Sequence, residues 1–291
     1  MISRDIISNM NGILWKTALK IGNESAIKLI HILFKSLKAQ NGGIMSKVII
    51  ENNGKVAILR LNNGVTNAIN SDLIRDLDEA ILTIKKEAQG MVLAGGDKFF
   101  SIGFDLPTLL KYTRAEMADF LYTFCGLSLN LFTLPLPTCC AMMGHAIAGG
   151  NILALTSDYR FAVSGKKLGL NEIKLGLPVP YLADLMLRQI VGDRVATKML
   201  YSGEFMITDE AKQAGLVDEI FSPEEIEAQA VERISKIADL PSKAFMEIKA
   251  NRVEEVRIRY EASSKNEILL DCWFSQPAQD LLQEAAKKFS K

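Results

Sequence analysis

A single carboxylate stands out in the middle of this 291-residue chain. Glu172 is flanked by leucine, isoleucine and valine at positions 168, 170, 173, 175, 177 and 179. An acid enclosed by apolar side chains has a raised pKa, so it can take up and return a proton near neutral pH. An acid on a surface turn instead stays ionised and solvated. Both interpretations are open here, and only the first makes Glu172 a proton carrier.

A glycine-containing junction between a strand and a helix precedes this acid. Residues 138–143 form a short apolar strand pattern, residues 144–150 are mostly small, and residues 151–156 have an apolar helix pattern. The first N–H groups of a helix have no partner within it, and the helix dipole favours negative charge there. Glycine allows a ligand oxygen to approach this backbone closely. The junction therefore suits an anion, and a plain tight turn is the alternative.

The histidines and cysteines restrict the possible chemistry. His31 and His145 are the only histidines, which excludes a histidine-rich metal site. Neither has a convincing context for a Ser-His-Asp mechanism, and we interpret His145 as packing or as part of a pocket wall. The cysteines have no zinc-binding spacing. We interpret them as buried free thiols of a reducing compartment: Cys125, Cys139, Cys140 and Cys272.

The composition is that of a chain with a packed core. Hydrophobic residues make up 48% of the sequence, and the 34 lysines and arginines equal the 34 aspartates and glutamates. This balance gives no electrostatic reason to expect a nucleic-acid partner. No apolar run is long enough to span a membrane. Nothing in the sequence implies a metal or redox cofactor.

Strand and helix patterns alternate up to the acid, which predicts βαβ units and a largely parallel sheet. Asn70 begins one helix, and the capping box of Thr113 and Glu116 begins another that runs to about residue 132. The expected strands are at 47–51, 56–61, 91–94, 138–143 and 159–163.

Helical patterns dominate after residue 180. A capping box at Ser222 has a proline at the first helical position. The other expected helices are 181–191, 194–201, a short one capped by Thr208, 244–264 and 276–289. We expect a core at residues 45–238 and a C-terminal helical part at 239–291.

The first 44 residues differ from the rest. Five lysines and an apolar helical pattern indicate a basic amphipathic extension, which can lie on a membrane or act as a transit peptide. A further hypothesis is that Met45 is the true start, because codons for the preceding glycines can supply a ribosome-binding sequence. We expect a cytoplasmic protein, or one of the mitochondrial matrix if the extension is a transit peptide.

Three motifs in order resemble the crotonase family, also called the enoyl-CoA hydratase/isomerase superfamily. Residues 100–106 are similar to its F-x-A-G-x-D-L segment, residues 144–158 to its N-G-x-x-x-G-G-G…D segment, and residues 211–217 to its A-x-x-x-G-L-V signature. The resemblance covers about residues 48–289. Two departures are Ile102, where alanine is usual, and Ala148, where the first of three glycines is usual.

The resemblance implies an α/β fold with a crotonase-like ββα spiral core and a C-terminal helical part that mediates homotrimers or hexamers. It implies an acyl-CoA thioester as substrate, with coenzyme A present only as part of that substrate. The thioester oxygen would lie between the backbone N–H groups of Phe104 and Gly149. Further substrate contacts are implied at Asn67, Ala68, Ile69, Ile102, Asp105 and Leu106.

The acids differ among members of this family, and here one of three positions keeps its acid. Hydratases use two glutamates, at the positions of Ile152 and Glu172, and other members use an aspartate at the position of Pro180. Residues 148–152, 154–160 and 169–172 are most similar to mitochondrial-type Δ3,Δ2-enoyl-CoA isomerases.

We therefore expect an isomerase in which Glu172 is the proton shuttle and Ile152 lines the pocket where a hydratase would hold water. The alternatives are an enoyl-CoA hydratase or acyl-CoA thioester hydrolase of the same family, and a non-catalytic acyl-CoA-binding protein.

Overall fold

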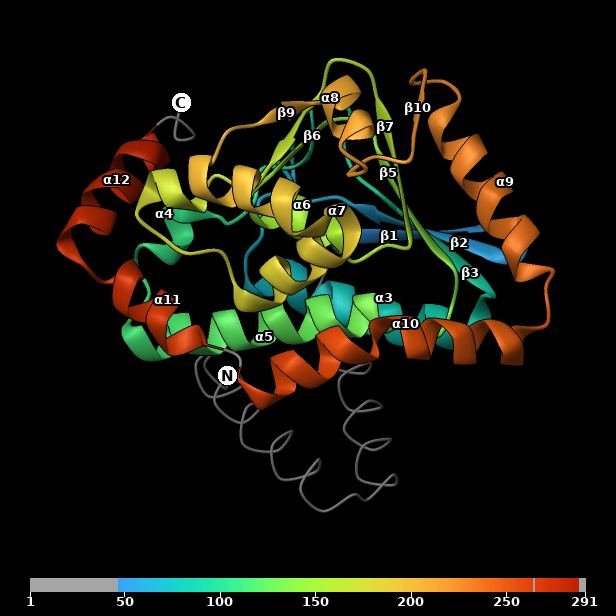
Figure 1. Ribbon diagram of the computed structural model, residues 1–291, viewed down its shortest axis with the longest axis horizontal. Coiled ribbons are helices and arrows are strands. Elements are labelled where there is room, and N and C mark those ends of the chain that lie inside the picture. The colour runs from blue at the N-terminus through green and yellow to red at the C-terminus, as the bar shows by residue number, and fades with distance from the viewer. Residues whose placement is uncertain (1–46, 264, 288–291) are drawn as a thin grey trace, which may run out of the picture. The chain divides into compact units, whose positions relative to one another are not determined.

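Two sheets of unequal size carry the described part of the chain, residues 47–263 and 265–287 of a computed structural model (Figure 1). In the larger sheet, β1 pairs with β2 antiparallel and all other neighbours are parallel. Its strands, in spatial order, are β1 (Val48–Asn53), β2 (Val56–Leu61), β3 (Gly90–Ala94), β5 (Thr138–Met142), β7 (Tyr159–Val163) and β10 (Glu219–Phe221).

The smaller sheet is built from the strands that follow those of the larger one. Its order is β4 (Phe99–Ser101), β6 (His145–Ile147), β8 (Lys167–Gly169) and β9 (Met206–Ile207). The successive pairs β3–β4, β5–β6 and β7–β8 each place one strand in each sheet. The chain therefore winds as a spiral of strand–strand–helix turns, which confirms the expected ββα core.

Helices cover the larger sheet and close its spiral turns (Figure 1). Helix α9 lies against β2, β3, β5 and β7, whereas α3 packs on α5 and on β1. The bounds are α3 (Ser71–Glu87), α4 (Leu106–Leu109), α5 (Arg114–Phe132), α6 (Gly149–Leu155), the 3-10 turn η1 (Glu172–Leu175), α7 (Tyr181–Ser202), α8 (Thr208–Gln213), α9 (Ile226–Ala238), α10 (Ser242–Ala262), α11 (Asn266–Trp273) and α12 (Gln276–Lys287).

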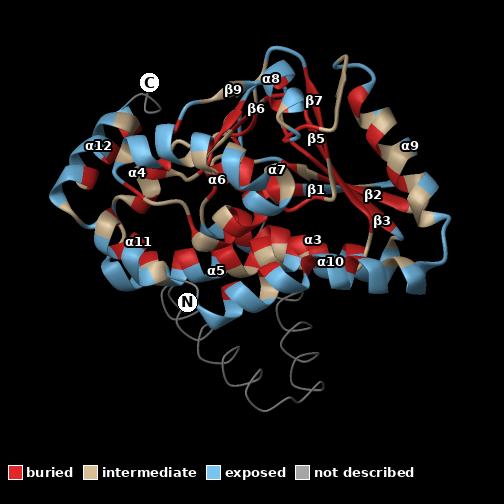
Figure 2. Ribbon diagram, in the orientation of Figure 1, coloured by how far each residue is buried: buried red, intermediate tan, exposed pale blue. Residues whose placement is uncertain are grey.

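The strands of the larger sheet are mostly buried (Figure 2), and their alternate residues face two separate cores. Cys140 belongs to the large core between the sheets, and its neighbour Cys139 belongs to a small core beneath α9. The two thiols therefore point to opposite faces, as the strand pattern predicts. Burial raises the pKa of both. The described cysteines are all free, and Cys272 is only partly buried.

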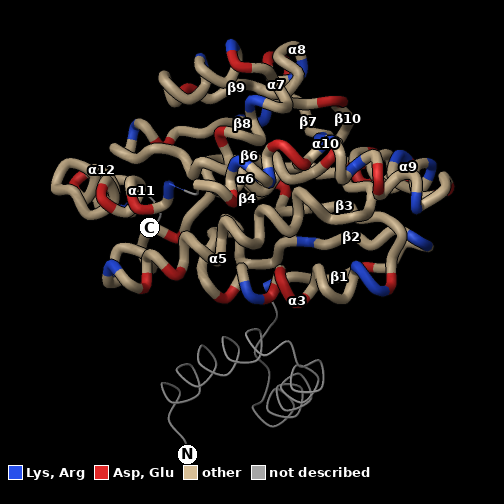
Figure 3. Tube along the Cα trace, turned by 60° about the horizontal axis from the view of Figure 1, so that its bottom comes forward, with Lys and Arg blue, Asp and Glu red and all other residues tan. Residues whose placement is uncertain are grey.

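Acidic and basic side chains are interspersed over the surface helices (Figure 3). One cluster of ion pairs joins α9 to the sheet edge. Arg60 of β2 donates to Glu227 of α9 at 2.6 and 2.9 Å and to Glu51 of β1 at 2.6 and 3.2 Å. These charged side chains connect one element to another and do not form a surface region of a single charge sign.

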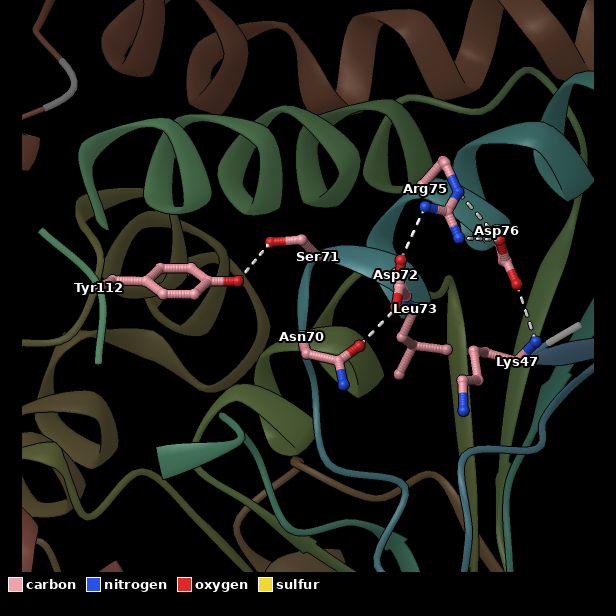
Figure 4. A network of polar contacts seen from close by, with 8 residues as sticks. All are labelled: Lys47, Asn70, Ser71, Asp72, Leu73, Arg75, Asp76 and Tyr112. Carbon is pink, nitrogen blue, oxygen red and sulfur yellow. Dashed lines mark hydrogen bonds and ion pairs between the residues drawn. The ribbon is translucent and has the colours of Figure 1, made fainter. Parts of the chain in front are cut away.

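The start of α3 shows how local signals place the chain (Figure 4). Asn70 caps the helix by accepting from Leu73 N at 3.1 Å, as predicted, and its amide nitrogen donates to Asp105 at 3.3 Å. Asp76, which is buried, accepts from the backbone N–H of Lys47 at 2.8 Å. The helix is thus tied both to the first strand and to the segment around Asp105.

One expectation for the C-terminal half is wrong, and one helix was not predicted. Helix α9 begins at Ile226, three residues after Pro223, because the Glu225 carboxylate accepts from the Ser222 hydroxyl at 2.9 Å and the box does not close on the backbone. Helix α11 lies in a segment for which no helix was predicted. The kink between the two predicted parts of α7 is at Gly192, where φ is 76°.

The C-terminal helices pack on the spiral core, α10 against α7, α11 against α5, and α12 against α4 and η1. They belong to the same compact unit as the core. The expectations for residues 1–44 lie outside the described residues. Within residues 47–263 and 265–287, no helix is long and apolar enough to cross a membrane.

Candidate active site

A cavity of about 570 Å³ lies where the spiral core meets the last two helices. Its wall combines the segment before α4, the start of α6, the turn η1, and both α11 and α12. Lining residues that the argument uses are Phe104, Gly149, Asn171, Glu172, Trp273 and Leu282. Trp273 and Leu282 are at most 1% exposed, so this part of the wall is a continuation of the core.

Glu172 is the buried acid of this cavity. Its side chain is 8% exposed, and within the described residues no group donates a hydrogen bond to its Oε2 atom. Burial raises the pKa of Glu172 to about 7, and the hydrogen bond from its own backbone N–H only partly opposes this. Of the two interpretations left open by the sequence, the structure has the buried acid, and a carboxyl group with this pKa can exist in both protonation states at neutral pH.

The turn η1 is held in place from both ends. Leu177 N donates to the Glu172 carbonyl at 3.0 Å, and Gly176 ends the turn with a φ of 73°. A Cβ atom at Gly176 would lie 3.3 Å from the Cα and Cβ atoms of Ala278 in α12. The last helix therefore packs directly on the turn that carries the acid.

Phe104 presents a backbone N–H that the neighbouring strand does not use. Ile69 N donates to Gly103 O at 2.8 Å, and Asp105 N donates to Ile69 O at 2.9 Å. In such a parallel bridge the residue between these two, here Phe104, points its own N–H away from Ile69. The Phe104 N–H therefore makes no bond to Ile69, and Phe104 lines the cavity.

Gly149 supplies a second such group, because it is the first residue of α6. A Cβ at Gly149 would lie 3.0 Å from the Phe104 ring, and a Cβ at Gly103 would lie 3.0 Å from Gly149 N. The two N–H groups therefore belong to segments in close contact. Ala148, the residue before Gly149, has a φ of 48°. Its N–H donates to Gly169 O at 2.8 Å, which holds this conformation.

The sequence family described as enoyl-CoA hydratase/isomerase matches residues 51–289. This chain belongs to that family. The resemblance drawn from the motifs is thereby confirmed, and the match extends through the C-terminal helices that complete the cavity.

Relatives of this enoyl-CoA hydratase/isomerase family member are named for different activities. The short-chain-enoyl-CoA hydratase of Clostridium acetobutylicum is 27% identical over 250 residues, which cover 84% of this chain and 96% of that protein. The crystal structure of human mitochondrial Δ3,Δ2-enoyl-CoA isomerase is 25% identical, with a TM-score of 0.80 over 84% of this chain and 98% of that one. An enoyl-CoA hydratase structure from Mycobacterium ulcerans, EchA3, is 26% identical with a TM-score of 0.73, over 79% of this chain and all of that one.

A second cavity of about 210 Å³ gathers several of the residues expected to contact substrate. Ala68 and Asp105 line it, and Ile102, Phe104 and Leu106 line both cavities. The two cavities therefore share one wall.

The other three expected contacts lie behind the walls. Asn67, which is 2% exposed, accepts from Asn63 N at 2.8 Å and donates to Phe100 O at 3.1 Å, so it shapes the loop. Ile69 and Ile152 are at most 1% exposed and belong to the large core. Neither of these two lines a described cavity, and their roles as substrate contacts stay predictions.

His145 lies in the cavity wall as interpreted from the sequence. Its Nδ1 accepts from the backbone N–H of Lys167 at 2.8 Å. Partial burial and the nearby charges of Lys166 and Lys167 lower its pKa. His145 is therefore neutral at pH 7, and its described role is to join β6 to β8.

The share of the wall that comes from α11 and α12 was not predicted from the sequence. Leu269, Trp273 and Leu282 lie about a hundred residues after Glu172 and line the same cavity. Apolar residues at positions 269, 270 and 273 have helical spacing, which could have indicated α11. Asn171, beside the acid, was also not singled out.

Proposed function

We propose that this enzyme moves the double bond of a 3-enoyl-CoA to the 2-position, with Glu172 as the only acid–base group. The observation that carries the proposal is that the described cavity wall holds one buried carboxylate, that of Glu172. The described wall contains two carboxylates, Glu172 and Glu284, and only Glu172 is buried. Glu284 is exposed on α12.

The N–H groups of Phe104 and Gly149 would hold the thioester oxygen, on which negative charge develops as an enolate forms. The Glu172 carboxylate removes a proton from Cα, and the electrons of that C–H bond delocalise into the thioester. The same carboxyl group then returns the proton to Cγ, and the double bond comes to lie between Cα and Cβ. A pKa of about 7 suits a group that must both accept and donate this proton.

Hydration of a 2-enoyl-CoA is the second candidate, because the name of the Clostridium acetobutylicum relative is that of a hydratase. Hydratases of this family use a second glutamate, and that position here is Ile152, an apolar residue 1% exposed. Without that acid, the site offers one carboxylate fewer to hold and activate water. A thioester hydrolase and a non-catalytic acyl-CoA-binding protein remain alternatives without an observation that favours them.

The test compares wild type with Glu172→Gln on a 3-enoyl-CoA, following formation of the 2-enoyl thioester. We expect kcat to fall roughly 100- to 10,000-fold, because the variant has no proton acceptor. In wild type, kcat should rise with pH through about 7, since the carboxylate form starts the reaction. Glu247→Gln, an exposed acid on α10, is the matched control and should leave kcat unchanged.

Parallel assays separate the alternatives. Fast hydration of a 2-enoyl-CoA without isomerisation would support the hydratase, and release of free coenzyme A would support the hydrolase. Binding of an acyl-CoA without exchange of its Cα proton for solvent deuterium would support a binding protein. Each of these results would overturn the isomerase assignment.

A further inference from the structure

Asn171 breaks a local rule at the turn that carries Glu172. It occupies the N-cap position of η1, where an asparagine side chain normally accepts a backbone N–H of the first turn. Here the side chain makes no capping bond. Lys174 N donates instead to the Asn171 backbone carbonyl at 3.0 Å. The Asn171 carboxamide therefore does not make the capping hydrogen bond that usually explains an asparagine at this position.

Asn171 lines the large cavity together with Glu172. Asn171 Oδ1 and Glu172 Oε2 are both fully buried atoms, and within the described residues neither has a hydrogen-bond partner. A buried acceptor without a donor costs about 1–3 kcal/mol. Two such acceptors on consecutive residues of one cavity wall need a donor, and a proton on the carboxyl group provides one.

We propose that Asn171 is a positioning residue whose Oδ1 atom accepts a hydrogen bond from the Oε2–H of neutral Glu172. The inference rests on the proposed function, because the neutral carboxyl is the state between removal of the proton from Cα and its return to Cγ. The proton that leaves Cα forms the Oε2–H bond, and the same bond breaks when Cγ is protonated. Between these two steps, the hydrogen bond to Asn171 holds the proton of Glu172 in a fixed direction within the cavity.

The other ionisable groups around this pair are exposed or only partly buried. His145, Lys167, Lys174 and Glu284 line the cavity. Helix α7, which packs against η1, contributes Asp184, and this carboxylate is paired with Arg188 at 2.9 Å. Asn171, whose Oδ1 atom is buried, is therefore a polar neighbour of Glu172 on the described cavity wall.

The deciding experiment is infrared difference spectroscopy of the ligand-free protein at pH 5, with Glu172→Gln subtracted to isolate the carboxyl band of Glu172. Asn171→Leu removes the acceptor, and Asn171→Asp keeps an acceptor oxygen in its place. We expect the wild-type C=O band at the frequency of a hydrogen-bonded acid, a shift to higher frequency in Asn171→Leu, and no such shift in Asn171→Asp. An unchanged band in Asn171→Leu would overturn the inference; Asn171→Ala replaces it if the leucine variant does not fold.

Turnover provides the second readout. Loss of one hydrogen bond to the neutral acid, worth about 1 kcal/mol, should lower kcat of Asn171→Leu roughly five- to tenfold with little change in KM. The two proposals fail separately. If the band shifts while wild type does not isomerise a 3-enoyl-CoA, the pairing stands and the proposed function fails. If wild type is active and the band is unchanged, the pairing fails alone.

Discussion

The protein treats buried charged groups in opposite ways at two of its sites. Beside β5, the ammonium group of Lys249 donates to Asp158 and to the Leu136 carbonyl, each at 2.8 Å. Asp158 also accepts from the N–H and the hydroxyl of Thr138 at 2.9 Å. In the cavity, the Oε2 atom of Glu172 receives no hydrogen bond from the described residues.

The difference separates a charged group that stabilises the fold from one that can take up and release a proton. Lys249 and Thr138 together donate three hydrogen bonds to the Oδ2 atom of Asp158, so the cluster fixes α10 to the sheet. Glu172 lacks such partners, so its protonation state can change without breaking a network. Burial lowers the pKa of Lys249, and Asp158 opposes this shift, whereas little opposes the raised pKa of Glu172.

Stability as a function of pH tests this contrast most strongly. A pKa of about 7 in the folded state, against an ordinary value of 4.5, means that the unfolded chain loses the Glu172 proton more readily. Stability therefore falls as pH rises from about 4.5 to about 7 and does not recover above it. Glu172→Gln removes this penalty, so at pH 8 it should be about 3 kcal/mol more stable than wild type.

The measurement is urea unfolding of both proteins at pH 5 and at pH 8. The two free energies of unfolding should be nearly equal at pH 5 and should diverge at pH 8. A variant that is less stable than wild type at pH 8 would mean that the carboxylate has partners in the folded protein. Glu172 would then resemble the Lys249 cluster, and the contrast would be lost.

Lys249→Met should have the opposite profile. It leaves Asp158 and the Leu136 carbonyl without their common donor, and breaking such a pair should destabilise the protein by about 2–3 kcal/mol, given that Asp158 is 27% exposed. The catalytic rate measured below the melting temperature should stay unchanged. Thermal unfolding at pH 7 gives the stability, and the double variant with Asp158→Asn should recover part of the loss.

The local elements could be predicted from the sequence because their signals are local. The Asn70 cap, the Thr113 capping box and the alternation along β5 each depend on residues a few positions apart. The short strands β4, β6, β8 and β9 were not predicted, since two or three residues carry no periodicity and pairing partners far along the chain define them. Residues 266–273 were missed because an eight-residue helix gives few periodic positions.

The site was predicted in part, for a reason visible in η1. The apolar neighbours of Glu172 suggested burial, yet within this turn Ile173 is 50% exposed and Glu172 is 8% exposed. Hydropathy alone would have assigned the reverse. The orientation depends on α12, which packs on Gly176 from more than a hundred residues away in the sequence. The unused cap of Asn171 is likewise a property of the folded chain.

Ala278→Leu would test the contact between α12 and the turn. Ala278 is fully buried against Gly176, so extra methylene groups should displace η1 and cost about 1–3 kcal/mol. The catalytic rate should also fall, because the displaced turn carries Glu172. Gln283→Leu, on the exposed side of α12, is the control for the added side chain. Loss of stability with full activity would show that α12 does not position the acid.

The smallest effect is expected at Ala148, the position where the family usually has glycine. A φ of 48° and a ψ of −122° are strained for alanine, and Ala148→Gly should release about 1 kcal/mol. Glycine also loses more freedom on folding, so the net gain should be below that value. Ala154→Gly, within α6, has no such strain to release and should destabilise by about 1 kcal/mol. The thermal unfolding temperatures of the two variants should therefore shift in opposite directions. Equal losses of stability would mean that two backbone hydrogen bonds, from Ala148 N to Gly169 O and from Ile152 N to Ala148 O, hold the junction without strain.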